Sequence, residues 1–154
     1  MSLDTYDSAT LAILQKAYTT WNDGRASTLL GYQPEMLMPD NEQSFVPDWN
    51  KHWARTSIQT VIEPQATLSC CVGENGKRRY ETQGLCFVQI FSPKTNEGMK
   101  QARQLAIIAR SAFRGQRAGN SIVFRNARIQ DGLAPEVNCF RFNVVTEYEY
   151  DESN

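Results

Sequence analysis

One stretch of the chain, residues 79–114, constrains the fold more than any other. Residues 79–91 form a pattern typical of a long strand, with Gly84 at its centre, where a bulge or a close backbone approach is expected. Pro93 ends the strand, and a short polar loop follows. Residues 97–114 then predict an amphipathic helix. Its buried face is expected to consist of Ala102, Leu105, Ala106, Ala109, Ala112 and Phe113.

A first helix is predicted near the start of the chain. It begins at Asp7 or Ser8, either of which can cap it, and ends at Trp21. Residues 25–50 show no sustained period, so they are interpreted as a long connection with one short strand at most; connections of this length are often functional. The apolar face of the first helix is expected to consist of Leu11, Leu14, Ala17, Tyr18 and Trp21.

Alternating β-formers predict the remaining strands. The last of them has one apolar and one polar side, which is typical of a sheet covered on one face only. The apolar side carries Phe140, Phe142, Val144, Thr146, Tyr148 and Tyr150, and the polar side carries Arg141, Asn143, Val145, Glu147 and Glu149. The predicted strands are residues 53–62, 65–72, 120–129 and 138–150, with a type I′ turn at Glu74-Asn75-Gly76-Lys77 and a turn at Asp131-Gly132.

The order helix, three strands, helix, two strands predicts an α+β fold, a mostly antiparallel sheet with two main helices packed on it. With 154 residues, of which 41% are hydrophobic, the chain is expected to form a single domain over residues 1–154. Residues 1–6 and 151–154 are interpreted as loose termini. The sequence shows neither a secretory start nor an apolar run long enough for a membrane span, so a cytoplasmic site of synthesis is expected.

Residues that carry out chemistry are scarce. His52 is the only histidine, so Ser-His or Cys-His catalysis would have to use it. Glu147 and Glu149 share a strand side, but alternating glutamates near a terminus are typical of a solvated surface. The four cysteines (Cys70, Cys71, Cys86 and Cys139) lack metal-ligand spacing and are interpreted as small hydrophobic residues. The sequence therefore predicts no enzyme activity, no cofactor and no metal.

Charge is strongly segregated along the chain although the net charge is only −1. Residues 77–128 hold eleven bases and two acids, and both flanking segments are acidic. A basic middle between acidic ends can attract nucleic acid, or it can let identical subunits dock through opposite charges. A third interpretation is that the fold interleaves the segments and cancels the field.

The second helix carries a row of exposed positions, here called the arginine stripe: Arg103, Ile107, Arg110, Arg114 and Arg117. At 100° per residue these positions fall within about 80° of the helix circumference, provided that the helix reaches Arg117. The stripe is interpreted as a solvated face or as a contact with a subunit or partner, because arginine suits interfaces. Nucleic-acid binding is less favoured, since the stripe has no aromatic residue for base stacking.

Acidic partners for the stripe exist in the same chain. They are Glu147, Glu149, Asp151 and Glu152 near the end, or Asp40, Glu42 and Asp48 in the long connection. A head-to-tail contact between the stripe of one subunit and the acids of the next would make a ring if the rotation closes.

Four features in sequence order resemble the small tail terminator, or tail-completion, proteins of long-tailed bacteriophages. They are the N-terminal helix, Trp53-Ala-Arg-Thr at the start of a strand, the Gly84-to-Pro93 block with its Gly98-led helix, and a closing hairpin that ends at Tyr150. The resemblance covers roughly residues 9–150.

This resemblance implies an α/β fold and a ring, commonly of six subunits, on the head-proximal end of the tail tube. Such a ring stops tube polymerisation and presents a docking surface to the head-side connector, and DNA passes through its lumen without specific binding. The expected partners are further copies of the chain, the tail tube protein and the connector, and the expected location is the virion, assembled in the host cytoplasm. The alternatives are another neck or head-completion protein, a nucleic-acid-binding module, which the acidic pI of 5.9 disfavours, and a small enzyme.

Overall fold

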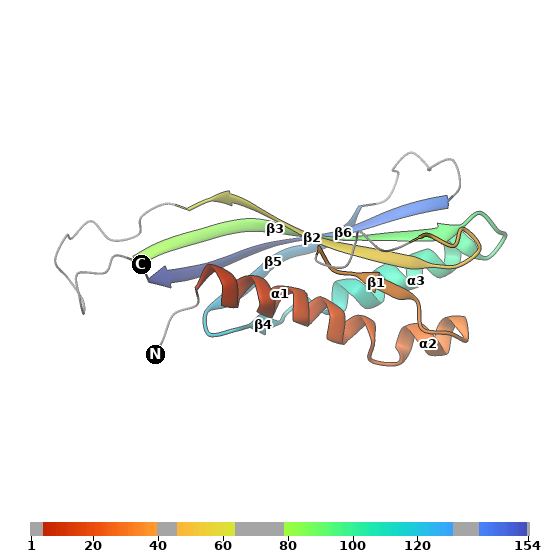
Figure 1. The fold of residues 1–154 in the computed structure, drawn as a ribbon, viewed down its shortest axis with the longest axis horizontal. Helices are drawn as coiled ribbons and strands as arrows, with labels where there is room; N and C mark the ends of the chain where they lie inside the picture. The colour runs from red at the N-terminus through yellow and green to blue at the C-terminus, as the bar shows by residue number, and fades with distance from the viewer. Residues whose placement is uncertain (1–4, 40–45, 64–78, 131–138, 154) are drawn as a thin grey trace.

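The computed structural model describes residues 5–39, 46–63, 79–130 and 139–153 of the 154-residue chain. These residues form a long, curled sheet with helices against one face (Figure 1). The elements are α1 (Tyr6–Trp21), α2 (Arg25–Leu30), β1 (Glu35–Leu37), β2 (Trp53–Ile62), β3 (Arg79–Pro93), α3 (Gly98–Ser111), β4 (Arg117–Ala118), β5 (Ile122–Gln130) and β6 (Cys139–Ser153).

Within the described residues, the sheet has six strands in the order β1-β2-β3-β6-β5-β4. β1 runs parallel to β2, and all other neighbours are antiparallel. The two longest strands, β3 and β6, lie side by side over their full length, from the pair Arg79 and Ser153 to the pair Pro93 and Cys139. This central ladder extends past the N-terminal end of α1 (Figure 1). The predicted α+β class and mostly antiparallel sheet are confirmed.

The predicted order of elements was incomplete. The 25–50 connection contains both α2 and β1, and β4 lies between α3 and β5. These elements have six, three and two residues, too few for any period to appear in the sequence. Strand 65–72 and the turns at residues 74–77 and 131–132 lie outside the described residues. β6 continues through residues 151–153, which therefore end a strand and do not form a separate tail.

The buried face of α1 agrees with the predicted one only at Ala17 and Trp21. Its core positions recur every four residues: Ala9, Ile13, Ala17 and Trp21. Leu11 and Tyr18, which were expected inside, are 58% and 45% exposed. The cap also differs, because Thr5 and Ser8 form a reciprocal capping box in place of a cap at Asp7 or Ser8. The Trp21 indole N–H donates to the Pro34 carbonyl oxygen (2.8 Å), which ties the end of α1 to the chain before β1.

α3 packs on the centre of the sheet through small side chains. All six residues predicted for its buried face are buried, and the Phe113 ring packs against Phe124 of β5 with centroids 5.1 Å apart and an interplanar angle of 60°. At Gly98, a side chain would overlap the Pro93 carbonyl group, so the helix starts directly against the end of β3. Alanines and a glycine at these positions let the helix axis approach the strands closely.

The two sides of β6 differ largely as predicted. Phe142, Val144, Thr146, Tyr148 and Tyr150 are buried under the helices. On the other side Glu147 and Glu149 are only half-buried, but Val145 is buried although no helix of the described chain covers that side. At Gly84 of β3, directly opposite Tyr148, a Cβ atom would overlap the Tyr148 hydroxyl and the Gln59 carbonyl oxygen. The predicted close backbone approach at this glycine is confirmed.

Candidate interaction surface

The arginine stripe lies on the outer side of α3, away from the sheet. Arg103 and Arg114 are exposed, Arg110 is half-buried, and Ile107 among them is 51% exposed. Arg110 stands in the last turn of α3, where a cation interacts favourably with the helix dipole. The stripe is thus a cationic surface around one exposed apolar side chain, the composition that interfaces favour.

The helix does not reach Arg117. α3 ends at Ser111, and one more turn follows in which the Arg114 N–H donates to the Arg110 carbonyl oxygen (3.1 Å). Gly115 then takes a left-handed φ of +69°, which redirects the chain. Arg117 therefore belongs to the exposed edge strand β4, and only Arg103, Ile107, Arg110 and Arg114 form a stripe with helical geometry.

None of the four arginines of the stripe forms an ion pair within the described parts of the chain. Other arginines there do: the Arg25 guanidinium lies 2.8 Å from the Asp23 carboxylate, and this contact, with its hydrogen bond, lowers the pKa of Asp23. The four arginines therefore project their charge outwards.

Glu147 and Glu149 already have partners in their own chain. They lie on the sheet face opposite the helices, where Arg125 of β5 contacts Glu149 at 2.5 Å and Arg128 lies 3.9 Å from Glu147. The Asn126 side-chain amide also donates to Glu147 from a bulge where its φ is +52°. Sequence analysis missed Arg125 and Arg128 because strand neighbours are set by register, and no local pattern in β5 gives that register.

One copy of the chain therefore does not bring its arginine stripe and these two glutamates together. The stripe is on the helical layer, and the glutamates are on the open face of the sheet. A contact between them would have to join two copies, as the sequence hypothesis requires, and it would compete with the existing pairs to Arg125 and Arg128. Their assignment as interface residues stays a prediction.

His52 is a buried and fully hydrogen-bonded side chain. Its Nε2 donates to the Gln101 amide oxygen (2.9 Å), which leaves Nδ1 to accept from the Ser92 hydroxyl (2.6 Å). Burial lowers the pKa of His52, and the hydrogen bond to Gln101 offsets part of that effect. Ser92 is only 1% exposed, so its hydroxyl is closed to a substrate in this conformation. The three residues join the start of β2, the end of β3 and the first turns of α3.

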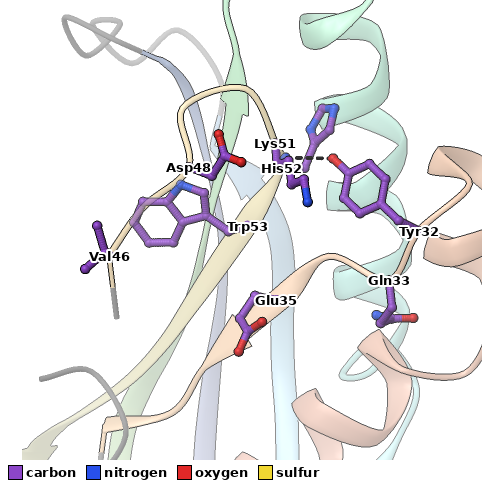
Figure 2. A pocket seen from close by; sticks show the side chains of 8 residues that line it. All are labelled: Tyr32, Gln33, Glu35, Val46, Asp48, Lys51, His52 and Trp53. Carbon is purple, nitrogen blue, oxygen red and sulfur yellow. Dashed lines mark hydrogen bonds between the residues drawn. The ribbon is translucent and has the colours of Figure 1, made fainter. Parts of the chain in front are cut away.

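A hollow of about 280 Å³ lies beside His52, and the long connection supplies most of its wall (Figure 2). The Tyr32 hydroxyl accepts from the backbone N–H of His52 (2.9 Å), and the Lys51 ammonium lies 5.7 Å from the Tyr32 ring centre. Charges of both signs line this hollow. The lining residues are Tyr32, Gln33, Glu35, Val46, Asp48, Lys51, His52 and Trp53.

Two of the four cysteines, Cys86 and Cys139, lie in the described chain, and both are buried. Burial raises the pKa of Cys86 to about 12, so this thiol stays protonated at neutral pH. The described residues contain no cluster of three or more His, Cys, Asp or Glu side chains that would hold a metal ion. No helix among them is long and apolar enough to cross a membrane. Cys70 and Cys71 lie outside the described residues.

Comparison with known proteins gives matches in structure only. No family model matches the sequence, and no curated protein matches it. One solved structure, of a protein without a functional name, covers 90% of this chain and 93% of its own at 14% identity and a TM-score of 0.50. Another belongs to the virion of a native gene transfer agent particle and covers 96% of this chain and 100% of its own at 11% identity and a TM-score of 0.47. At 14% identity, the first similarity shows a shared fold alone.

Proposed function

We propose that this chain is a structural protein of a long-tailed phage or phage-like particle, a tail terminator that acts as a ring of identical subunits. The sequence resemblance carries the family assignment. The sheet with helices on one face is the architecture that this resemblance implies. The chain would assemble in the host cytoplasm and reside in the virion.

The observation that most favours an assembly role is the outward charge of the arginine stripe. Four arginines that form no ion pair with the described residues surround or follow an exposed isoleucine on α3. Arginine forms forked hydrogen bonds to carboxylates and loses its hydration more readily than lysine, so it suits a surface that becomes buried. In a ring, this surface would contact the neighbouring subunit, and the remaining surfaces would face the tube and the connector.

The proposal assigns no catalytic role to any residue. The best-placed nucleophile and base are Ser92 and His52. Both are buried, and their hydrogen bonds to each other and to Gln101 connect α3 to the sheet. DNA would pass through the lumen of the ring without sequence-specific contacts.

Tube assembly in vitro tests this function. Purified tail tube protein from the same particle is allowed to polymerise with and without this chain, and tube lengths are measured by negative-stain electron microscopy. We expect shorter tubes that carry a ring at one end. Tubes of unchanged length, with no added density at either end, would contradict the proposal.

A nucleic-acid-binding module is the second candidate, because unpaired arginines also suit phosphate contacts. Such binding would weaken steeply with salt, since each neutralised phosphate releases counterions. Duplex and single-stranded DNA titrated at low and physiological salt separate the two functions. The terminator proposal predicts no specific binding, whereas tight binding that falls steeply with salt would favour the alternative.

A further inference from the structure

A hollow of about 520 Å³ lies near the Arg79 and Ser153 end of the β3–β6 ladder. At this end the strands extend past α1 (Figure 1). Tyr80 of β3 and Glu152 of β6 sit directly opposite each other there. Glu152 has the same parity along β6 as the buried residues Tyr148 and Tyr150, so it lies on the helix side of the sheet. Tyr80, its partner in β3, lies on the same side. The first residue of α1, Tyr6, and Glu63 after β2 complete the described lining. Here this site is called the tyrosine–glutamate hollow.

Among the described residues, no base neutralises the negative charge of the tyrosine–glutamate hollow. Neither Glu63 nor Glu152 forms an ion pair in the described residues, and the described part of the lining contains no base. Both carboxylates act on the same neighbouring phenol: burial is the main cause that raises the pKa of Tyr150 to about 12, and Glu152 and Glu63 add to it. The two carboxylates therefore converge on one place.

Two carboxylates beside two tyrosine rings are the surroundings that a guanidinium group prefers. The carboxylates accept forked hydrogen bonds, and the ring faces attract the planar cation. A lysine ammonium would gain less, because it is more strongly hydrated and cannot form the fork. The chemistry of the hollow thus selects arginine as its occupant.

The chain itself carries, on a different surface, arginines that have no ion pair among the described residues. We propose that the tyrosine–glutamate hollow of one copy receives Arg110 and Arg114 of the arginine stripe from the next copy. The pairing joins two carboxylates to two guanidinium groups that stand one helical turn apart. Because the two surfaces are different patches of the same molecule, the contact is heterologous and propagates to a ring if the rotation closes. This inference rests on the self-assembly in the proposed function and names its contact.

Glu147 and Glu149 are the natural comparison for this contact. They are also two glutamates close together, here on one side of β6, but Arg125 and Arg128 already pair with them. If net negative charge alone attracted the arginine stripe, substitution of either glutamate pair would weaken self-association equally. If the hollow is the receptor, only Glu63 and Glu152 matter.

The test uses three variants of the full chain: Glu63→Gln/Glu152→Gln, Arg110→Glu/Arg114→Glu, and the matched control Glu147→Gln/Glu149→Gln. Self-association is followed by sedimentation velocity over a concentration series at low salt, after circular dichroism confirms that each variant is folded. We expect the first two variants to associate about tenfold or more weakly, because each loses one side of a hydrogen-bonded charge contact. The control should associate as the wild type does. Glu63→Gln alone, at an exposed position, serves if the double variant does not fold.

Mixing the two weakened variants gives the sharpest result. Each keeps one intact surface, so the hollow of the arginine variant can bind the stripe of the glutamine variant. We expect a heterodimer that does not grow further, because both outer surfaces are disabled. Homodimers, no complex, or larger assemblies in the mixture would overturn the inference.

Failure of this inference is distinguishable from failure of the proposed function. If the wild type forms a ring and both Glu63→Gln/Glu152→Gln and Glu147→Gln/Glu149→Gln still form it, the proposed contact is wrong but the proposed ring stands. A wild type that stays monomeric at high concentration and low salt would also overturn the contact, whereas tube capping would still decide the function.

Discussion

Gly84 gives the most direct quantitative test of the central β-ladder. It lies in β3 between Thr60 of β2 and Tyr148 of β6. A methyl group at this position would overlap the Tyr148 hydroxyl and the Gln59 backbone carbonyl. The carbonyl cannot move without disturbing the β2–β3 pairing, which is already irregular between Thr60 and Ile62. A glycine-to-alanine change lowers the conformational entropy of the unfolded chain, which by itself would stabilise the protein. At this position overpacking should outweigh that gain, so we expect Gly84→Ala to be destabilised.

The expected cost follows from the number and kind of contacts. Overpacking of one methyl group costs about 1–3 kcal/mol. In a domain of this size each kcal/mol lowers the thermal midpoint by about 2–4 °C, so we expect a decrease of about 2–12 °C. Thermal unfolding followed by circular dichroism measures the midpoint, and urea unfolding gives the free energy of unfolding separately.

A second substitution identifies the contact responsible. Tyr148→Phe removes the hydroxyl that Gly84→Ala would overlap, but it leaves the ring Cζ atom and the Gln59 carbonyl in place. We expect Tyr148→Phe to cost less in the Gly84→Ala background than in the wild type, a coupling that a double-mutant cycle measures. An unchanged midpoint for Gly84→Ala would refute the close approach at this position. Additive effects in the cycle would show that the Tyr148 hydroxyl is not the contact responsible.

Three further predictions concern local interactions. His52 should titrate below 6.5 in the folded chain by NMR, because burial lowers its pKa. The unfolded chain then binds more protons, so the free energy of unfolding should be fully retained above pH 6.5 and should decrease as the pH falls below that value. The variant His52→Gln should not show this decrease. Thr5→Ala should lower the free energy of unfolding by about 1 kcal/mol through loss of the capping box with Ser8, while Thr19→Ala at an exposed site serves as control. Cys86 should resist alkylation until the chain unfolds, since burial raises its pKa to about 12. The free energy of unfolding should decrease above about pH 9, because the thiol ionises in the unfolded chain and stays protonated in the folded one. Rapid labelling of Cys86 in the folded protein, measured by mass spectrometry, would contradict the burial of this thiol.

Long elements were predictable from local patterns. β2 has the predicted bounds, and β3 and β6 extend only a few residues beyond theirs, because strict alternation over ten or more residues leaves few other interpretations. α3 has one clear small-residue face, and that face is buried. α1 carries apolar residues on two sides, so periodicity alone could not choose Ala9 and Ile13 over Leu11 and Tyr18.

Of the interaction surfaces, one could be predicted from local spacing and the others could not. The exposed stripe on α3 could be predicted, since helical spacing alone places Arg103, Ile107 and Arg110 on one side. The partners of Glu147 and the composition of the tyrosine–glutamate hollow depend on which strands are neighbours and in what register. Residues 6, 63, 80 and 152 meet only after the sheet has formed, and no local pattern contains that information.

The central claim is that this protein acts by assembling with copies of itself. The native mass of the wild type, measured free and bound to tube ends, tests this most directly. We expect a ring of about six copies of the 17.5 kDa chain in at least one of these states, and its loss in Arg110→Glu/Arg114→Glu but not in a charge-matched Lys51→Glu/Lys94→Glu control. A single chain in both states, or a ring that the arginine variant leaves intact, would contradict the account.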